Sequence, residues 1–226
     1  MKPQLNRYEI KAGINKTFVF VSDLHNAEYD ELLSMISECR PHGILVGGDF
    51  THNSKNRKNG LVFLREATKI SPVFVSLGNH ECLTDVIREE VKDSGAILLD
   101  NNFVSHDGFV IGGLTPGDFY TDGLPRTDFL DEFCKEDSYR ILLCHHPEYY
   151  EKYLKNKSID LILSGHAHGG QWRIFGRGIY APGQGIFPKY TSGMYDGKLI
   201  VGRGLANMVK IPRINNKTEI ILLKIC

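Results

Sequence analysis

Two features of the 226-residue sequence predict an α/β fold. Short apolar runs, rich in Leu or β-branched residues, recur along the chain, and each is closed by Gly, Asn, Asp or Pro, which is typical of buried strands. Stretches with apolar residues three and four positions apart lie between the first of these runs, which is typical of helices that cover a sheet. Strand, helix and strand in alternation indicate parallel crossovers packed on a buried sheet.

The elements follow in chain order. We expect strands over 18–23, 43–49, 72–80, 109–114, 140–147 and 161–168, and helices over 29–40, 61–70 and 84–93. The segment GRGIYAPGQGIFPKYTSGMYDGK at 176–198 is rich in Gly, Pro and Tyr, and predicts a long loop that forms one wall of a substrate cleft. Two more strands are expected over 199–205 and 219–225. The length fits a single domain over residues 1–226.

Composition limits the partners of the protein. Lys and Arg number 27, as do Asp and Glu, so no overall charge favours a nucleic acid. No apolar run approaches the ~20 residues that a membrane helix needs, and the start MKPQLNRYEIKAG lacks the apolar core of a signal peptide. We expect a cytoplasmic protein, and the sequence leaves its oligomeric state open.

Polar side chains that bind metals follow the predicted strands where each strand ends. They are Asp23, His25, Asp49, Asn79, His80, His145, His166 and His168. In open α/β sheets this edge is where active sites gather. Side chains at i and i+2 of an extended segment point the same way. Asp23 with His25, and His166 with His168, are therefore expected to enter one cavity.

The chemistry of this set indicates a metal centre. Apart from His80, the set contains two aspartates, one asparagine and four histidines, whose oxygen and nitrogen ligands suit Mn, Fe, Zn or Ni better than Ca or Mg. Seven ligands are too many for one closed tetrahedral site. They fit two divalent ions about 3.5–4 Å apart that share Asp49. Glycines such as Gly78 and Gly165 would then let the backbone approach the ions closely.

DxH and GD are weak signals alone, and GNHE and GHxH are more specific. Together with an isolated His they resemble the signature of the calcineurin-like metallophosphoesterase superfamily across residues 23–168. The resemblance implies a four-layer α/β/β/α sandwich of two mixed sheets, with the C-terminal strands in the second sheet. It implies one metal on Asp23, His25 and His168 and the other on Asn79, His145 and His166, with Asp49 bridging. His146 competes with His145 for the isolated position, and the His-x-Pro pattern of the family favours His145.

The sequence after GHAH adds a finer resemblance. GGQ and the later YAPGQGIFPKYTSGMY are similar to a branch of small bacterial phosphoesterases linked to envelope lipid or cell-wall substrates. The branch implies a small-molecule or lipid-linked phosphate ester as substrate. It also leaves peripheral contact with a membrane open.

The predicted reaction is hydrolysis of a phosphate ester, with a phosphodiester as the favoured substrate. In this hypothesis a hydroxide that bridges the two metals attacks phosphorus, and His80 protonates the leaving group, so Asp49 and His80 are the catalytic residues. The role of Glu81 stays open between orienting His80 and serving as an acid at a helix N-terminus.

The alternatives are a phosphomonoesterase or a nuclease on the same site, or a scaffold of this fold without catalysis. A nuclease is disfavoured because no basic surface with interleaved aromatic residues is visible in the sequence. A scaffold would be expected to lack a ligand or His80, and neither is missing.

Overall fold

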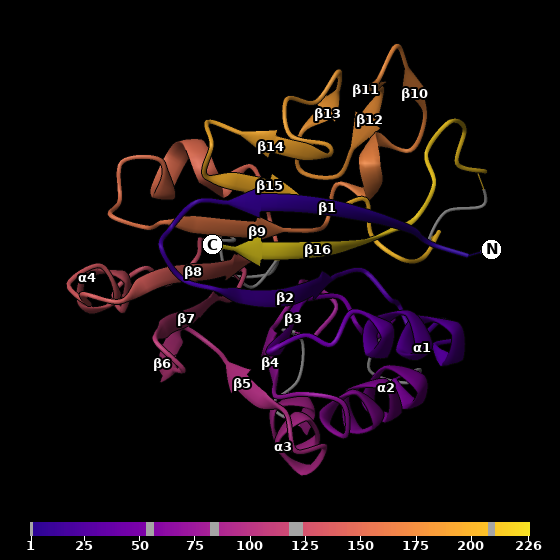
Figure 1. Cartoon of the computed structure of the whole chain (residues 1–226). Helices are drawn as coiled ribbons and strands as arrows, with labels where there is room; N and C mark the ends of the chain where they lie inside the picture. The colour runs from indigo at the N-terminus through magenta and orange to yellow at the C-terminus, as the bar shows by residue number, and fades with distance from the viewer. Residues whose placement is uncertain (1, 53–56, 82–85, 118–123, 208–210) are drawn as a thin grey trace.

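The computed structural model of the chain describes residues 2–52, 57–81, 86–117, 124–207 and 211–226. Two six-stranded mixed sheets face each other at its centre (Figure 1). The first has the order β1 (Gln4–Ile10), β16 (Glu219–Ile225), β2 (Lys16–Val21), β3 (Gly43–Gly47), β4 (Val73–Ser76) and β5 (Ile97–Leu99). The second has the order β14 (Gly193–Tyr195), β15 (Leu199–Val201), β9 (Leu161–Ser164), β8 (Tyr139–Cys144), β7 (Phe109–Leu114) and β6 (Asn102–His106).

Helices cover the outer faces of both sheets. α1 (Asp30–Glu38), α2 (Lys58–Thr68) and α3 (Val86–Asp93) pack on the first sheet. The second sheet is covered by the short α4 (Leu130–Phe133), by a π-helical turn (Tyr150–Leu154) and by Tyr190. The predicted α/β class and its sandwich of two mixed sheets are thus confirmed. No helix of the described segments combines the length and the apolar character needed to cross a membrane.

The central core lies between the two sheets. Phe18 and Phe20 from β2 and Phe74 from β4 pack there with Phe109 from β7, and the rings of Phe18 and Phe109 meet edge to face with centroids 4.9 Å apart. β3, β4 and β9 are buried at every position because both of their faces are covered. Their sequences are therefore continuous apolar runs, which is why they could be predicted.

The C-terminal strands divide between the sheets. β15 joins the second sheet, parallel to β9, as expected. The expectation is wrong for β16, which lies in the first sheet, parallel to β1 and antiparallel to β2. Its inward side chains, including Ile221 and Leu223, fill the core between the sheets, while Ile220 packs toward the helices. Burial on both faces suits a strand inside a sheet.

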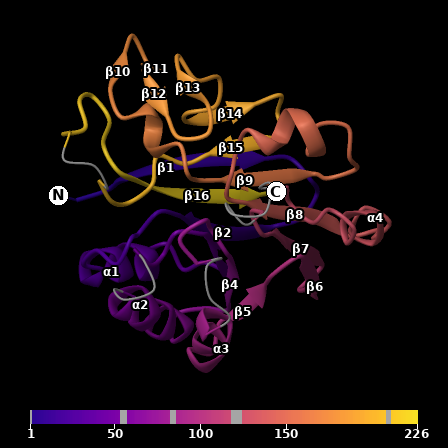
Figure 2. The ribbon, with the colours of Figure 1, turned by 180° about the vertical axis from the view of Figure 1, so that it is seen from behind.

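The expectation of a long loop over 176–198 is wrong, because this segment contributes to several short strands. β10 (Arg173–Ile174) pairs with β11 (Arg177–Gly178), and β12 (Tyr180–Ala181) pairs with β13 (Gly185–Ile186). Gly176 (φ 78°) and Gly183 (φ 70°), in the turns of these hairpins, have positive φ, which only glycine adopts without strain. The two hairpins stand at the end of the molecule opposite α3 (Figures 1 and 2).

Candidate metal centre

The predicted ligands gather where five central strands end, three in the first sheet and two in the second. Asp23 and His25 follow β2, Asp49 follows β3, and Asn79 and His80 follow β4; His145 follows β8, and His166 and His168 follow β9. Because both sheets present these strand ends to the same side, the structure brings all eight predicted site residues together. Asp23, His25, Asp49, His145 and His166 are buried, and the other three are partly buried.

The side chains converge for a different reason from the predicted one. The expected alternation along an extended strand does not apply, because β2 ends at Val21 and β9 at Ser164, before the ligands begin. Asp23 and Asp49 have φ of 54° and 52°, and His25, His166 and His168 also have positive φ. Non-glycine residues in this left-handed region are uncommon and cluster at functional sites. The tight turns after the strands aim these side chains.

Two glycines allow these turns to pass beside the carboxylates. A Cβ atom on Gly78 would lie 2.1 Å from Asp49 Oδ1, and one on Gly165 would lie 2.5 Å from Asp23 Oδ2. Both distances are too short for a carbon and an oxygen that are not bonded. The close backbone approach predicted for these two positions is therefore present.

The first predicted ligand set is compact. Asp23, His25 and His168 each offer a ligand atom within 4.8 Å of the others. His25 Nε2 lies 3.3 Å from His168 Nε2, and His168 Nε2 lies 3.5 Å from Asp23 Oδ1. His25 Nε2 is also 3.7 Å from Asp49 Oδ2, so the proposed bridging carboxylate borders this set.

Both neighbouring histidines enter the second set. His145 Nε2 lies 3.1 Å from Asp49 Oδ2, and its Nδ1 donates a hydrogen bond to the Gly47 carbonyl (2.7 Å). The His146 ring stacks on the His166 ring with centroids 3.9 Å apart. The side chains of His145, His146 and His166 bring ligand atoms within 4.8 Å of one another. His145 therefore adjoins the carboxylates, while His146 lies further out against His166.

Asn79 reaches the same group from β4. Its Oδ1 lies 3.3 Å from His146 Nε2, and the His146 Nδ1 lies 3.0 Å from Glu148 Oε1. The sequence pattern that favours His145 as the isolated ligand is compatible with this geometry, and His146 stands beside it as a second imidazole.

The protonation of the centre suits cations. Burial lowers the pKa of His25 to about 4 and also lowers the pKa values of His166 and His168, so these rings are neutral at neutral pH with a lone pair to share. Burial alone would raise the pKa of Asp49, but His145 beside it holds that pKa well below its usual range. The carboxylate is therefore charged.

Unpaired polar atoms test whether a metal fits. Among the described residues, His25 Nδ1 is buried without a hydrogen bond, whereas His145 Nε2 lies 3.1 Å from the Asp49 carboxylate as its ion-pair partner. Buried polar groups are seldom left unpaired. Carboxylate oxygens and imidazole nitrogens that converge in this way fit divalent transition metals.

Glu81 connects the loops that carry Asp49 and Asn79. Its buried carboxylate accepts hydrogen bonds from the backbone N–H groups of Asp49 (2.8 Å), Thr51 (2.8 Å) and Gly78 (2.9 Å), and from the Thr51 hydroxyl (2.9 Å). Burial and the charge of Asp49 raise its pKa to about 7. The carboxylate of Glu81 binds these two loops rather than the ring of His80.

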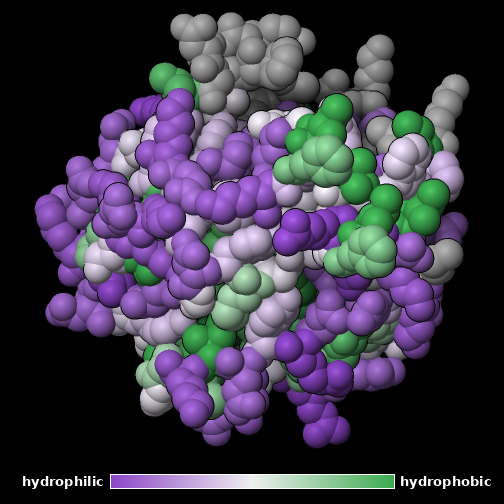
Figure 3. Space-filling model, turned by 90° about the horizontal axis from the view of Figure 1, so that it is seen from above, coloured by the Kyte–Doolittle hydropathy of each residue, from purple (hydrophilic) through white to green (hydrophobic). Residues whose placement is uncertain are grey.

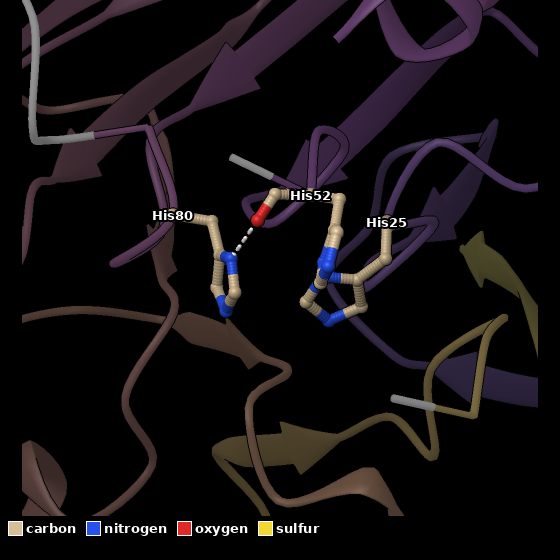
Figure 4. A group of neighbouring side chains, drawn as sticks. All are labelled: His25, His52 and His80. Carbon is tan, nitrogen blue, oxygen red and sulfur yellow. Dashed lines mark hydrogen bonds between the residues drawn. The ribbon is translucent and has the colours of Figure 1, made fainter. Parts of the chain in front are cut away.

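His80 is oriented by backbone contacts. Its N–H donates to Asp49 Oδ1 (3.0 Å), and its ring Nδ1–H donates to the carbonyl oxygen of His52 (Figure 4). The other ring nitrogen, Nε2, lies 3.9 Å from Asp49 Oδ2. Because Nδ1 is occupied, Nε2 is the atom of His80 that is available to a substrate.

His52 joins the site although it belongs to none of the predicted motifs. Its ring stacks with His80 at 5.7 Å between centroids, and ligand atoms of His25, His52 and His80 lie within 4.8 Å of one another. Figure 4 shows the rings of His25 and His52 facing His80. Its position three residues after Asp49 was the sole sequence signal for this placement.

A cavity of about 360 Å³ opens beside the cluster. His25, Asp49, Asn79, His80, His166 and His168 line it. Its other lining residues include Trp172, Ile179, Tyr180, Pro182 and Ile211. A molecule in this cavity would contact both polar ligand atoms and apolar side chains.

Comparison with known proteins identifies the class. Residues 16–170 match the calcineurin-like phosphoesterase family, and the chain belongs to this family of metal-dependent phosphoric ester hydrolases.

Three bacterial relatives show the extent of the similarity. The uncharacterized protein YpbG of Bacillus subtilis is 30% identical over 177 residues, which cover 74% of this chain and 67% of YpbG. The uncharacterized metallophosphoesterase Cj0846 of Campylobacter jejuni is 30% identical over 66% of this chain and 41% of its own length. The phosphodiesterase YaeI of Escherichia coli is 26% identical over 69% of this chain and 62% of its own length. The chain thus spans less than two thirds of the latter two proteins.

Proposed function

We propose that the protein hydrolyses a phosphodiester at a dinuclear metal centre, with His80 as general acid. The position of Asp49 carries this proposal. One of its carboxylate oxygens, Oδ2, lies 3.7 Å from His25 in the first ligand set and 3.1 Å from His145 in the second. A carboxylate between two sets of imidazoles is an arrangement that suits a pair of cations.

The residues divide the work. One ion would be held by Asp23, His25 and His168, and the other by Asn79, His145 and His166. Asp49 would help to hold both ions. When bound, two such ions lower the pKa of water toward ~7 and stabilise negative charge on phosphate oxygens. Asp23 and Asp49 supply two negative charges against the four positive charges of two divalent ions, so the centre attracts an anionic ester.

His80 is suited to protonate the leaving group. The His52 carbonyl fixes its Nδ1–H, which leaves Nε2 to hold the proton that passes to the departing oxygen. The hydrogen bond from its backbone N–H to Asp49 keeps it beside the reacting centre. Positioned general acids of this kind accelerate reactions by typically ~10²–10⁴.

A diester is favoured over a monoester by the apolar wall of the cavity. Trp172, Ile179 and Tyr180 line the cavity with the ligand residues and would contact an ester substituent, whereas a monoester places a second charge on phosphate and has one substituent fewer. The name of YaeI, a phosphodiesterase, supports the same choice. A phosphomonoesterase remains the second candidate for this site.

The test compares two chromogenic esters on protein reconstituted with Mn²⁺. We expect bis(p-nitrophenyl) phosphate to be hydrolysed with a kcat/KM at least tenfold above that of p-nitrophenyl phosphate. The reverse order would assign a monoesterase, and a metal-loaded protein that hydrolyses neither would indicate a scaffold.

The His80→Ala variant tests the general acid. It is expected to keep its metal content while kcat falls by ~10²–10⁴. His106→Ala is the matched control, because His106 lies on β6 against the Phe74 ring, and its activity should stay within twofold of wild type. Full activity in His80→Ala would remove this residue from the mechanism.

A further inference from the structure

The two hairpins next to the cavity expose large apolar side chains. Phe175 at the tip of β10–β11 is fully exposed, and Ile186 and Phe187 at the end of β12–β13 are 71% and 77% exposed. Their exposed apolar neighbours are Trp172, Ile174, Tyr180, Ile211 and Ile214. Figure 3, which looks onto this end of the molecule, shows hydrophobic residues gathered on one side of the face. We call these eight residues the hairpin platform.

The platform is held together by hydrogen bonds. The Phe187 N–H donates to the carbonyl of Ile179, the residue between the two hairpins (2.8 Å), which ties the end of the second hairpin to its start. The Trp172 indole N–H donates to the Pro212 carbonyl (3.0 Å), and Trp172 and Ile214 form a parallel β-bridge. The apolar side chains are therefore displayed by an ordered backbone, although burying them elsewhere in the protein would be favourable. Exposed apolar patches of this kind mark interaction sites.

Charge identifies the partner. Between Asp160 and Glu219 the sequence contains eight Lys or Arg residues and a single acidic residue, Asp196, although the whole chain has no net charge. Arg177 at the start of β11 is exposed, and Lys189 just after the second hairpin is exposed in an ion pair with Glu151. An exposed apolar and aromatic patch beside such cations is complementary to the surface of a bilayer that contains anionic lipid.

The cavity connects the platform to the metal centre. Trp172, Tyr180 and Ile211 belong to the platform and also line the cavity together with the ligand residues. A phosphate group at the metal centre would therefore place its apolar substituent along a wall that continues to the exposed surface. An acyl or isoprenoid chain on such a substrate need not cross water to reach the site.

We propose that the hairpin platform docks on an anionic lipid bilayer and that the site takes phosphate esters of lipids from it. The substrate class rests on the proposed hydrolytic function, whereas the docking does not. Phe175 at the tip of the first hairpin and Phe187 at the end of the second enter the interface, and Arg177 meets the anionic headgroups. Added salt weakens the attraction between the cations and the headgroups but does not weaken the insertion of the apolar side chains.

Vesicle sedimentation tests the docking. Full-length protein is mixed with vesicles of phosphatidylcholine alone or with added phosphatidylglycerol. We expect sedimentation with the anionic vesicles and much less with the neutral ones. The double variant Phe175→Ser/Phe187→Ser is expected to bind the anionic vesicles at least tenfold more weakly. Val86→Ser is the matched control, because Val86 is 55% exposed on α3, at the opposite end of the molecule, and it should bind as wild type does.

Two further measurements separate the possible failures. Hydrolysis of soluble bis(p-nitrophenyl) phosphate should be equal in wild type and the double variant, whereas release of phosphate products from lipid esters in vesicles should fall with binding. Vesicle binding without any hydrolysis would refute the proposed function and leave the docking intact. Equal binding by wild type and the double variant, or self-association abolished by the double variant without vesicle binding, would overturn the docking.

Discussion

The metal centre and the hairpin platform both contribute residues to one cavity and are built in opposite ways. The centre buries charged and polar side chains, among them Asp23 and Asp49, behind the ends of fully buried strands. The platform exposes Phe175 and Phe187 on hairpins whose strands are two residues long.

The difference separates two functions. Buried carboxylates are costly unless they are paired, so a centre of this kind requires a scaffold that holds every ligand in place. Exposed apolar side chains cost little in stability but risk aggregation, so they are retained where they contact something. The centre is therefore suited to chemistry, and the platform to recognition.

The largest expected effect comes from breaking the centre at Asp49. Asp49→Ala removes the carboxylate between the two ligand sets, so bound metal and diester hydrolysis should be lost together. The fall in kcat should exceed the ~10²–10⁴-fold expected for a missing general acid. Metal content by mass spectrometry and turnover are measured on the same sample. Asp131→Ala, on the exposed surface of α4, is the control and should retain both. Metal retained in Asp49→Ala would contradict a bridging role.

A smaller effect is expected from replacing Glu81, which holds together the loops that carry the metal ligands. Glu81→Ala leaves the backbone N–H groups of Asp49, Thr51 and Gly78 without their acceptor. Each unsatisfied buried group costs about 1–3 kcal/mol, so the free energy of unfolding should fall by about 3 kcal/mol or more. Urea denaturation in the presence of chelator measures this without a contribution from metal.

The control for this variant is Glu132→Ala. Glu132 lies on α4 and forms an exposed ion pair with Lys135, which this substitution removes. It should change the free energy of unfolding by no more than about 0.5 kcal/mol. Equal effects in the two variants would show that Glu81 does not hold the loops together.

The smallest effect concerns the segment that follows the second hairpin. Hydrogen bonds from Lys189, Tyr190 and Lys155 lower the pKa of Glu151 from 4.5 to about 2. Because the folded pKa is lowered, the stabilisation is present above the unfolded value and is lost as the pH falls toward 2. Glu151→Gln should therefore lower the Tm at pH 7 by at most about 2–4 °C. The difference in Tm between wild type and Glu151→Gln should narrow as the pH falls from 4.5 to 3. A difference in Tm that does not change with pH would exclude an effect of the Glu151 charge.

The central strands could be predicted because burial on both faces leaves a continuous apolar run, as in β3 and β9. β1, with the sequence QLNRYEI, was not predicted, because it lies at the edge of its sheet and is nowhere fully buried. The short strands from β10 to β13 were missed for another reason. Two residues are too few to show a periodicity, and glycines dominate the local sequence.

The site was predicted through residue types, and its geometry was not. Carboxylates and imidazoles after several strands indicate one pocket whichever way the backbone turns. The left-handed conformations of Asp23 and His25 depend on contacts with distant segments, such as the hydrogen bond from the His25 N–H to the Asp49 carbonyl (2.9 Å). His52 matches none of the motifs, and its place beside His80 arises from the same packing of loops.

Anomalous scattering from a crystal grown with Mn²⁺ tests the metal centre most directly. The account predicts two manganese peaks about 3.5–4 Å apart, with Asp49 in contact with both. One peak should lie among Asp23, His25 and His168, and the other beside His145 and His166. A single ion, or two ions that Asp49 does not touch, would contradict it.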